Sequence, residues 1–402
     1  MAEFFLELFS EEIPSKLQQV TKEEILNNFK NIFEDKKIFY KKCSSYSTPN
    51  RLIILFSNIS VEISEPEQEI RGPKINAPEN ALQGFLKSNN IDMKQIYKKN
   101  TEKGEFYYFK KNKTKIKTID FLKDKIPEIL GNTKWKKSMR WNDYNLNWAR
   151  PLKSILAVFS GQVIQFNFFH LKSSNKTFID KEFEEKTKKF LDYKSYKFFF
   201  KKSGMIIENE ERKKLIEKKI KEASMKKNIY VDLDEKLLDE VNNLVESPSI
   251  LLCKFDKKFL HIPEEILVIV MQFHQKYFHS FDKNKKINNE FFVVANNKDQ
   301  KGLIKYGNEK VIEARLRDAE FFWNKNKSQN LVKQVSKLKN VNYFKNLGNY
   351  YDKSQRLKKL SGLISDELLI SKEKIEIAST ICKVDLLSDL VGEFPELQGV
   401  LG

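Results

Sequence analysis

The sequence predicts an α+β protein of several domains, with mixed α/β N-terminal and middle domains followed by an all-helical C-terminal part. Three observations predict this class: a strand–helix–strand–strand order near the N-terminus, an alternation of amphipathic helix and β-rich runs in the middle, and helical spacing of apolar residues over nearly all of the chain after residue 308. A chain of 402 residues is also too long for one ordinary core. We therefore expect domains over residues 1–170, 171–330 and 331–402.

In the first domain, apolar residues at every second position predict a strand over residues 3–9. Helical spacing predicts a helix over 20–33, and Thr21 with Glu24 forms a plausible capping box at its start. The other elements expected here are strands over 51–56 and 59–63, a loop over 65–79, a short helix over 81–87, a strand over 106–109, a helix over 119–130 that Pro127 interrupts, and a hairpin of residues 155–159 and 163–169.

The middle of the chain begins with residues 172–203, which are rich in Lys and weakly patterned. An amphipathic helix over 208–227 is the clearest element. The elements expected after it are a strand over 250–255, a buried helix over 264–273, a strand over 290–295, and helices from residue 308 onward with breaks at Gly307, Gly348, Gly362 and Gly392.

The charge balance indicates a polyanionic partner. Lys and Arg total 73 against 55 for Asp and Glu, which gives a net charge of +18 and a pI near 9.4. Only eight of the basic residues are Arg, and the wealth of Lys, Asn, Ile and Phe is also what AT-rich codons would supply. The few arginines are therefore the better pointers to function, because guanidinium makes contacts that ammonium cannot.

Membrane and secretory classes are excluded by pattern. The longest purely apolar run covers residues 266–271, far short of the roughly 20 residues that a membrane-spanning helix needs. The N-terminus lacks the basic region of a signal peptide. The three Cys residues are far apart and show no CxxC spacing, so we expect no disulfide framework, no Cys-based zinc site and a reducing cytoplasm.

Nucleotide and metal motifs are absent or weak. The scattered glycines form no GxG pair, so P-loop and dinucleotide-binding motifs are missing. His274 and His279 could form a metal pair with Asp282, although packing or hydrogen bonding of helix-end histidines is the plainer interpretation. A nucleophile pair of Cys253 with His274 has no local signature.

A segment with three of the four Trp residues and four cations covers residues 135–150. Its cations can contact phosphates, and its indole faces can stack on unpaired bases. The alternative is that the Trp side chains anchor a core and that Arg150 is a structural ion-pair partner. The sequence leaves both interpretations open.

Two further segments carry charge in a helical pattern. Arg315 lies on an apolar face of the predicted helix that follows Gly307, so it must reach a ligand or pair with Asp318 or Glu320. Near the C-terminus, Asp385 and Asp389 are four residues apart and could share a helix face. With Glu393 and Glu396 they either hold a hard metal ion or form a solvated acidic face.

Six blocks, in order along the chain, resemble the β subunit of the bacterial two-subunit glycine–tRNA ligase. They read FFLELFSEEIPSK, IRGPK with ALQGF, KSMRWNDYNLNWARPL, LVESPSILLCKFDKKFLHIPEEI with HQKYF, GNEKVIEARLRDAEFFW, and ICKVDLLSDLVGEFPELQGVLG. Two departures qualify the resemblance. The family's GHRF block is replaced by NKTFIDKEF, and members continue for several hundred residues past the last block, through an anticodon-binding region. We therefore expect a fragment or a truncated gene product.

The resemblance implies a non-catalytic β chain of an α2β2 ligase. The α subunit would carry the site that uses ATP and Mg²⁺ to activate glycine, so we expect no catalytic residue, metal ligand or cofactor in this chain. Residues 331–402 would begin an HD-type helical domain without its metal-binding histidines. The RNA contacts expected with tRNA(Gly) are Arg71, Lys74, Lys137, Arg140, Trp141, Lys276, Arg315 and Arg317.

Two alternatives remain from the sequence. One is a stand-alone RNA-binding protein or a metal-dependent phosphohydrolase that uses the helical C-terminal part. The other is a purely structural subunit whose helices dock the α subunit.

Overall fold

The computed structural model describes residues 2–400, apart from 66, 103, 112–113 and 180–185. The chain forms two compact units, Met1–Glu208 and Asn209–Gly402, so the second unit begins with helix α5 (Asn209–Lys227). The chain is thus mixed α and β, as predicted. The three-domain division at residues 170 and 330 stays a prediction.

The first unit is built on a five-stranded antiparallel sheet in the order β10-β9-β1-β3-β2. Its strands are β1 (Glu3–Ser10), β2 (Lys42–Thr48), β3 (Arg51–Ser57), β9 (Leu152–Phe159) and β10 (Gln162–Val163). Strand β1 lies at the centre, between β3 and β9. It therefore holds the chain's first residues in the middle of the unit.

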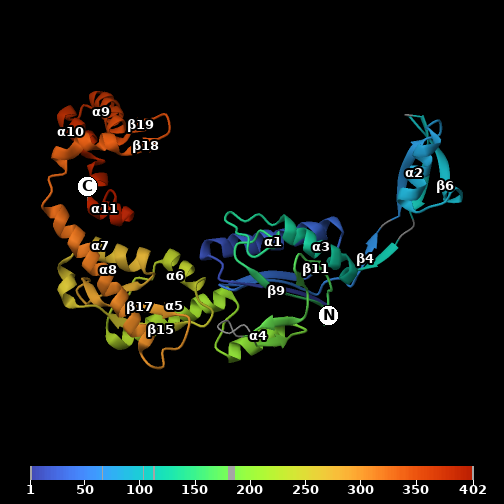
Figure 1. The fold of residues 1–402 in the computed structure, drawn as a ribbon, viewed down its shortest axis with the longest axis horizontal. Helices are drawn as coiled ribbons and strands as arrows, with labels where there is room; N and C mark the ends of the chain where they lie inside the picture. The colour runs from blue at the N-terminus through green and yellow to red at the C-terminus, as the bar shows by residue number, and fades with distance from the viewer. Residues whose placement is uncertain (1, 66, 103, 112–113, 180–185, 401–402) are drawn as a thin grey trace. The chain divides into compact units, whose positions relative to one another are not determined.

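Helices cover both faces of this sheet (Figure 1). Helices α1 (Ser15–Asp35) and α3 (Thr118–Asn132) pack on the face that carries Phe4, while α4 (Tyr193–Lys202) packs on the face that carries Phe5. Successive residues of a strand point to opposite faces, so a strand covered on both sides needs apolar residues at nearly every position. The buried run of β1 meets this requirement.

The turn between β9 and β10 shows how the local sequence sets a hairpin. Ser160 and Gly161 both have positive φ, +48° and +80°. A two-residue turn of this kind matches the twist of the strands on either side of it. The predicted hairpin is confirmed, although its second strand is only two residues long.

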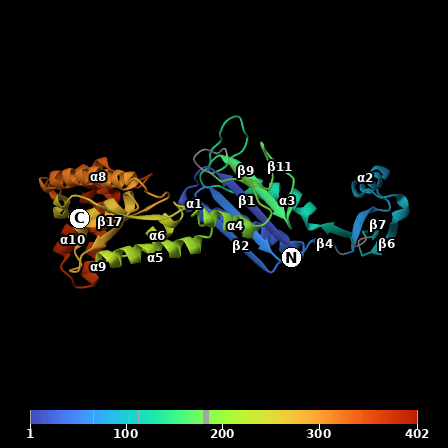
Figure 2. The same cartoon turned by 90° about the horizontal axis from the view of Figure 1, so that it is seen from below.

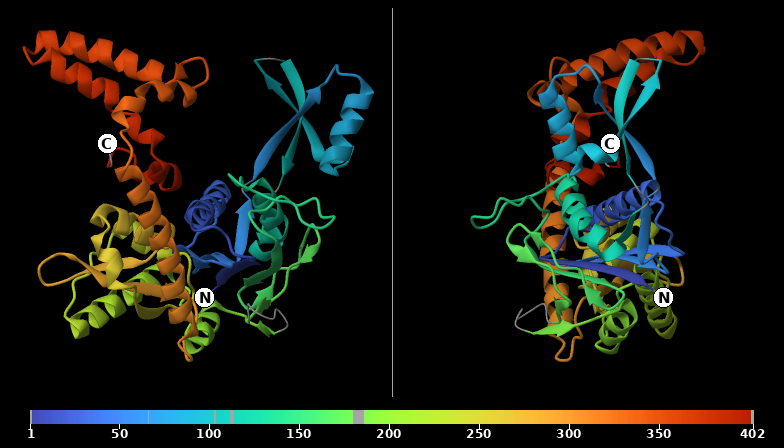
Figure 3. Two further views of the ribbon diagram at one scale, coloured as in Figure 1. Left: turned by 60° about the vertical axis from the view of Figure 1, so that its left-hand side comes forward. Right: turned by 90° about the vertical axis from the view of Figure 1, so that its right-hand side faces the viewer.

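A smaller three-stranded sheet in the order β5-β7-β6 lies beside α2 (Glu79–Asn89), as Figure 3 shows. A Cβ on Gly72 would lie 2.8 Å from the ring of Phe85, so only glycine lets β5 approach α2 this closely. The two halves of the second sequence block therefore pack on each other. The elements here are β4 (Glu62–Glu65), β5 (Gln68–Lys74), η1 (Met93–Gln95), β6 (Ile96–Thr101), β7 (Gly104–Lys111) and β8 (Thr114–Lys117).

Four short strands complete the first unit: β11 (Asn167–Phe168), β12 (Leu171–Lys172), β13 (Lys176–Phe178) and β14 (Thr187–Lys189). The stretch 175–183, which departs from the family's GHRF block, lies partly outside the described residues.

In the second unit, an antiparallel sheet in the order β15-β17-β16 lies between two helical layers (Figure 2). Helices α5 and α6 (Glu235–Asn242) cover one face, and α8 (Leu303–Lys327) covers the other. The strands are β15 (Ser249–Lys254), β16 (Phe278–Phe281) and β17 (Ile287–Ala295). The short helices that connect β15 to β16 are η2 (Lys257–His261), α7 (Glu264–Ile269) and the π-helical η3 (Val270–His274).

The C-terminal segment is mostly helical but includes a small hairpin. Its elements are η4 (Val332–Asn340), β18 (Asn342–Phe344), β19 (Gly348–Asn349), α9 (Tyr350–Glu367), α10 (Lys372–Ile381), η5 (Val384–Leu387), α11 (Asp389–Glu393) and η6 (Pro395–Leu397). The hairpin shows that the expectation of an all-helical C-terminal part is not confirmed.

Several element predictions are wrong. Residues 65–79 are not a loop throughout, because β5 pairs with β7 there despite Pro73. Pro127 does not interrupt α3, and Gly307 and Gly362 lie inside α8 and α9. A single glycine or proline costs helix stability, but tertiary packing outweighs that cost when the rest of the helix is well packed.

Candidate nucleic-acid interface

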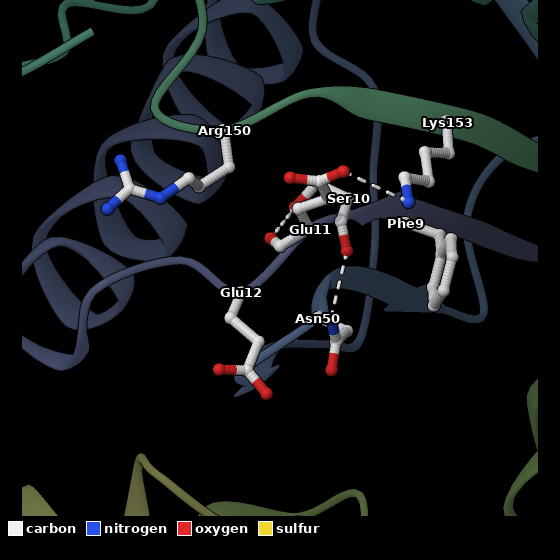
Figure 4. A pocket seen from close by; sticks show the side chains of 7 residues that line it. All are labelled: Phe9, Ser10, Glu11, Glu12, Asn50, Arg150 and Lys153. Atoms are coloured by element: carbon white, nitrogen blue, oxygen red, sulfur yellow. Dashed lines mark hydrogen bonds and ion pairs between the residues drawn. The ribbon is translucent and has the colours of Figure 1, made fainter. Parts of the chain in front are cut away.

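A cavity of about 480 Å³ lies at the carboxyl end of β1 (Figure 4). Three backbone hydrogen bonds shape it: the N–H of Ser10 donates to the Asn50 carbonyl at 2.8 Å, that of Glu11 to Pro151 at 3.0 Å, and that of Ile13 to Pro49 at 2.7 Å. The turn after β1 is thereby fixed against the start of β9. Two of the six sequence blocks, the first and the one that ends in WARPL, meet at this cavity.

The two cations that line the cavity, Arg150 and Lys153, have different partners. Lys153 lies 3.2 Å from the carboxylate of Glu11, whereas Arg150 donates to the Ala149 carbonyl at 2.9 Å. Figure 4 shows these two cations on different sides of the cavity. Asn50 is buried and donates to the Ser10 carbonyl at 3.1 Å, while its Oδ1 has no hydrogen-bond partner within the described residues. Arg150 and the carboxylate of Glu12 both line this cavity, so its wall carries charge of both signs. Arg150 was not among the predicted RNA contacts. The signal in the sequence that could have indicated it was its position close to the tryptophans.

The tryptophan segment contains both core and surface residues. Trp148 is 1% exposed and its ring lies 4.9 Å from that of Trp135, so both anchor the core beneath the segment. Trp141 is half-buried and meets the His170 ring edge-on at 5.8 Å. Arg140 is exposed and donates to Asn147 at 3.0 Å. The core interpretation is therefore correct for Trp148, while Trp135 is half-buried against the same core.

The predicted contacts in this unit form two groups. Lys137, Arg140 and Trp141 share the loop before β9. Arg71 and Lys74 are exposed on β5, where their cations lie 3.8 Å and 5.7 Å from the centre of the Phe106 ring. Stacking on an aromatic ring holds a cation in place without neutralising it. Both groups therefore present positive charge at the surface.

The predicted contacts in the second unit are engaged in ion pairs. Lys276 lies 2.9 Å from Glu240, and Arg317 lies 2.8 Å from Glu313. Arg315 pairs with Glu393 at 3.5 Å and reaches Asp318 at only 4.0 Å. Asp318 is therefore confirmed as a partner of Arg315, although at the limit of ion-pair distance. The other expected partner, Glu320, instead contacts His261.

The acidic residues near the C-terminus do not form a shared helix face, so that expectation is wrong. Asp385 lies in η5, is 2% exposed, and accepts the N–H of Gly399 at 2.6 Å. Asp389 begins α11, where a hydrogen bond from Lys325 of α8 lowers the pKa of its carboxyl group. Glu396 lies 3.3 Å from His274. These acids tie the last block to α8 and η3.

Nucleophile and metal chemistry find little support in the second unit. Burial raises the pKa of the Cys253 thiol to about 12, which keeps it protonated. His274 contacts Glu396, His279 is buried in β16, and Asp282 accepts backbone N–H groups of its own loop. Within the part of the chain that the structure describes, no three His, Cys, Asp or Glu residues gather closely enough to hold a metal ion. No helix among those residues is both long and apolar enough to cross a membrane.

Comparison with known proteins gives a consistent result. The family model described as glycyl-tRNA synthetase beta subunit matches residues 4–402. The chain is 35% identical to proteins named glycine–tRNA ligase beta subunit from Rickettsia felis, over 405 aligned residues, and Rickettsia prowazekii and Rickettsia typhi, over 403 each. Each alignment covers all of this chain and 60% of the relative, so the chain spans about 60% of the length of the curated relatives that it matches.

Proposed function

Since the chain belongs to the glycyl-tRNA synthetase beta-subunit family, we propose that it acts as the β chain of glycine–tRNA ligase. In this role it binds tRNA(Gly) and positions the acceptor end so that an α subunit can attach glycine. The observation that carries the proposal is the family match over nearly the whole chain.

Binding would rest on phosphate contacts and on stacking. The exposed cations on β5 and on the loop before β9 support this, because both groups lie on the surface of a strongly basic chain. Cations that contact phosphates fix the register and orientation of a nucleic acid. The chain would contribute to the rate by orienting the tRNA and not by acid–base chemistry.

Bond-making belongs, in this proposal, to the α subunit, which uses ATP and Mg²⁺. The proposal includes an α2β2 assembly in the cytoplasm and an HD-type fold for the segment after residue 331. The helical pair α9 and α10 supports the last point, although the β18–β19 hairpin departs from an all-helical fold.

Glycine-dependent exchange of pyrophosphate into ATP tests this division of labour. The purified chain alone should show no exchange above a blank without protein, whereas the α subunit should show it. Exchange by the chain alone would contradict the proposal. The same preparation should co-purify with a tagged α subunit.

No observation favours the phosphohydrolase alternative. It predicts a stoichiometric transition metal and turnover of phosphoesters by the isolated chain. Elemental analysis of the purified protein decides between the two functions, because the β-chain proposal needs no such metal.

A further inference from the structure

A second cavity, of about 730 Å³, lies in the second unit between the end of α5 and the β16–β17 hairpin. Its apolar wall is formed by Met225, Ile229, Tyr230 and Phe281. None of the eight predicted RNA contacts lines it. It therefore needs an explanation of its own.

The backbone holds the two aromatic residues of this cavity in register. Tyr230 and Phe281 exchange two hydrogen bonds, with the N–H of Tyr230 donating at 3.0 Å and that of Phe281 at 2.8 Å. Their ring centres are 6.2 Å apart and the planes are tilted by 40°. The side chain of Tyr230 is nevertheless 62% exposed. A fixed aromatic ring at the surface is a preformed stacking platform.

Lysines outnumber acids at and beside this platform. Lys283 and Lys285 line the cavity from the loop between β16 and β17, and both are exposed. Lys226 and Lys227 follow Met225 at the exposed end of α5. The carboxylate of Asp282 accepts the N–H groups of Asn284 and Lys286, at 2.8 Å and 2.9 Å, and so shapes its own loop. Asp232 is the other acid at the cavity.

An aromatic wall with a lysine rim favours one class of ligand. An apolar peptide would gain nothing from the lysines, and an inorganic anion would gain nothing from the ring of Tyr230. A nucleotide uses both features, because its base stacks and its phosphates carry negative charge. The amide of Asn228, which also lines the cavity, can hydrogen-bond to a base edge.

We propose that this cavity binds one unpaired nucleotide of a single-stranded RNA segment, with the base on Tyr230 and the flanking phosphates on Lys283 and Lys285. The proposal rests on the RNA-binding function proposed above. It goes beyond that function by adding a stacking site in the second unit that reads single-stranded and not double-helical RNA.

Fluorescence of short RNAs that carry 2-aminopurine tests the proposal, because stacking quenches this base. The probes are a 10-nucleotide single strand and a blunt hairpin of equal charge, titrated into the full 402-residue chain. Tyr230→Ala should weaken single-strand binding about 5- to 150-fold, which is the loss of one stacked base. It should also abolish the quenching, while Tyr230→Phe retains both. Hairpin binding should be unchanged in both variants.

Two further variants complete the design. Lys283→Ala with Lys285→Ala should lower the slope of log Kd against log salt by about 1.4 for the single strand, at about 0.7 per phosphate contact. Tyr306→Ala is the matched control, because Tyr306 is 60% exposed on α8. Equal single-strand binding by Tyr230→Ala and Tyr306→Ala would overturn the site. If tRNA still binds in that case, only this inference fails; if no RNA binds the unaltered chain, the proposed function fails with it.

Discussion

The guanidinium of Arg315 on α8 lies 3.5 Å from the carboxylate of Glu393 on α11. The pair joins the fifth and sixth sequence blocks at the edge of a shared core, to which Leu316 and Leu390, both fully buried, contribute. Arg315 therefore has a structural partner at the same position where we expect an RNA contact. The two roles can be separated by experiment.

Replacing either partner tests which role Arg315 has. The pair is about 40% exposed on both sides, so its loss should cost only about 0.2–1 kcal/mol of unfolding free energy. If Arg315 contacts RNA, Arg315→Ala weakens tRNA binding, whereas Glu393→Gln leaves it equal or tighter because the guanidinium is released. Urea unfolding and filter binding of both variants measure this. Equal losses of tRNA binding in the two variants would assign Arg315 a structural role.

Removing one partner of the buried pair Glu7–Arg51 should be far more damaging. Both side chains are 1% exposed, and Arg51 also donates to Phe178 and lies 4.6 Å from the centres of two Phe rings. Arg51→Met leaves a carboxylate buried without its counter-charge, so we expect a loss of about 3–5 kcal/mol. Denaturation followed by Trp fluorescence reports on this unit, which holds three of the four Trp residues.

The control for that experiment is the double variant Glu7→Met with Arg51→Met. It removes both charges and should recover most of the stability lost in the single variant. Should the double variant be as unstable as the single one, packing of the arginine stem, and not charge pairing, would explain the loss.

Arg140→Ala should reduce the salt dependence of tRNA binding. Arg140 is exposed, and the hydrogen bond to Asn147 leaves its charge free for a phosphate. Loss of one phosphate contact lowers the slope of log Kd against log salt by about 0.7–0.9. Arg356→Ala, at another exposed arginine outside the predicted set, should leave the slope unchanged. A slope unaffected by Arg140→Ala would remove this residue from the interface.

His279 makes the stability of the second unit depend on pH. Burial lowers the pKa of this imidazole below its ordinary 6.5, and the carboxylate of Asp232 opposes the shift only in part. The unfolded chain then binds a proton at a higher pH than the folded one, so stability is full above about pH 6.5 and falls as the pH drops from there toward the folded pKa. His279→Asn should flatten the free energy of unfolding against pH in this window, as measured by urea unfolding between about pH 5 and 7.5.

The sequence predicts best where one face, or both faces, of an element is buried. The stripe of α5 confirms its predicted type because burial of one face imposes a helical period, whereas β1, buried on both faces, confirms its type through a nearly unbroken apolar run. Strand β2, with the residues KCSSYST, was not predicted, because it lies at the sheet edge and carries few apolar side chains. Strand β5 was missed since Gly72 and Pro73 indicate a loop by themselves, while the packing of Phe85 on Gly72 is a tertiary contact.

Prediction of the candidate interface from the sequence has the same limit. Its blocks could be found in the sequence, and their residues are indeed brought together at the end of β1 and around α8. Which cations are paired could not be found, because Lys276 and Glu240, or Arg315 and Glu393, are distant in the chain. Pairing of this kind depends on the fold and not on local spacing.

Equilibrium binding of tRNA(Gly) to the purified chain across a salt series tests the central claim most directly. The account predicts saturable binding that weakens steeply with salt, and that weakens further on combined replacement of Arg71 and Arg140, at a position on each cationic group of the first unit. A chain that binds tRNA no better than an equally basic control protein, with a salt slope indifferent to both arginines, would contradict it.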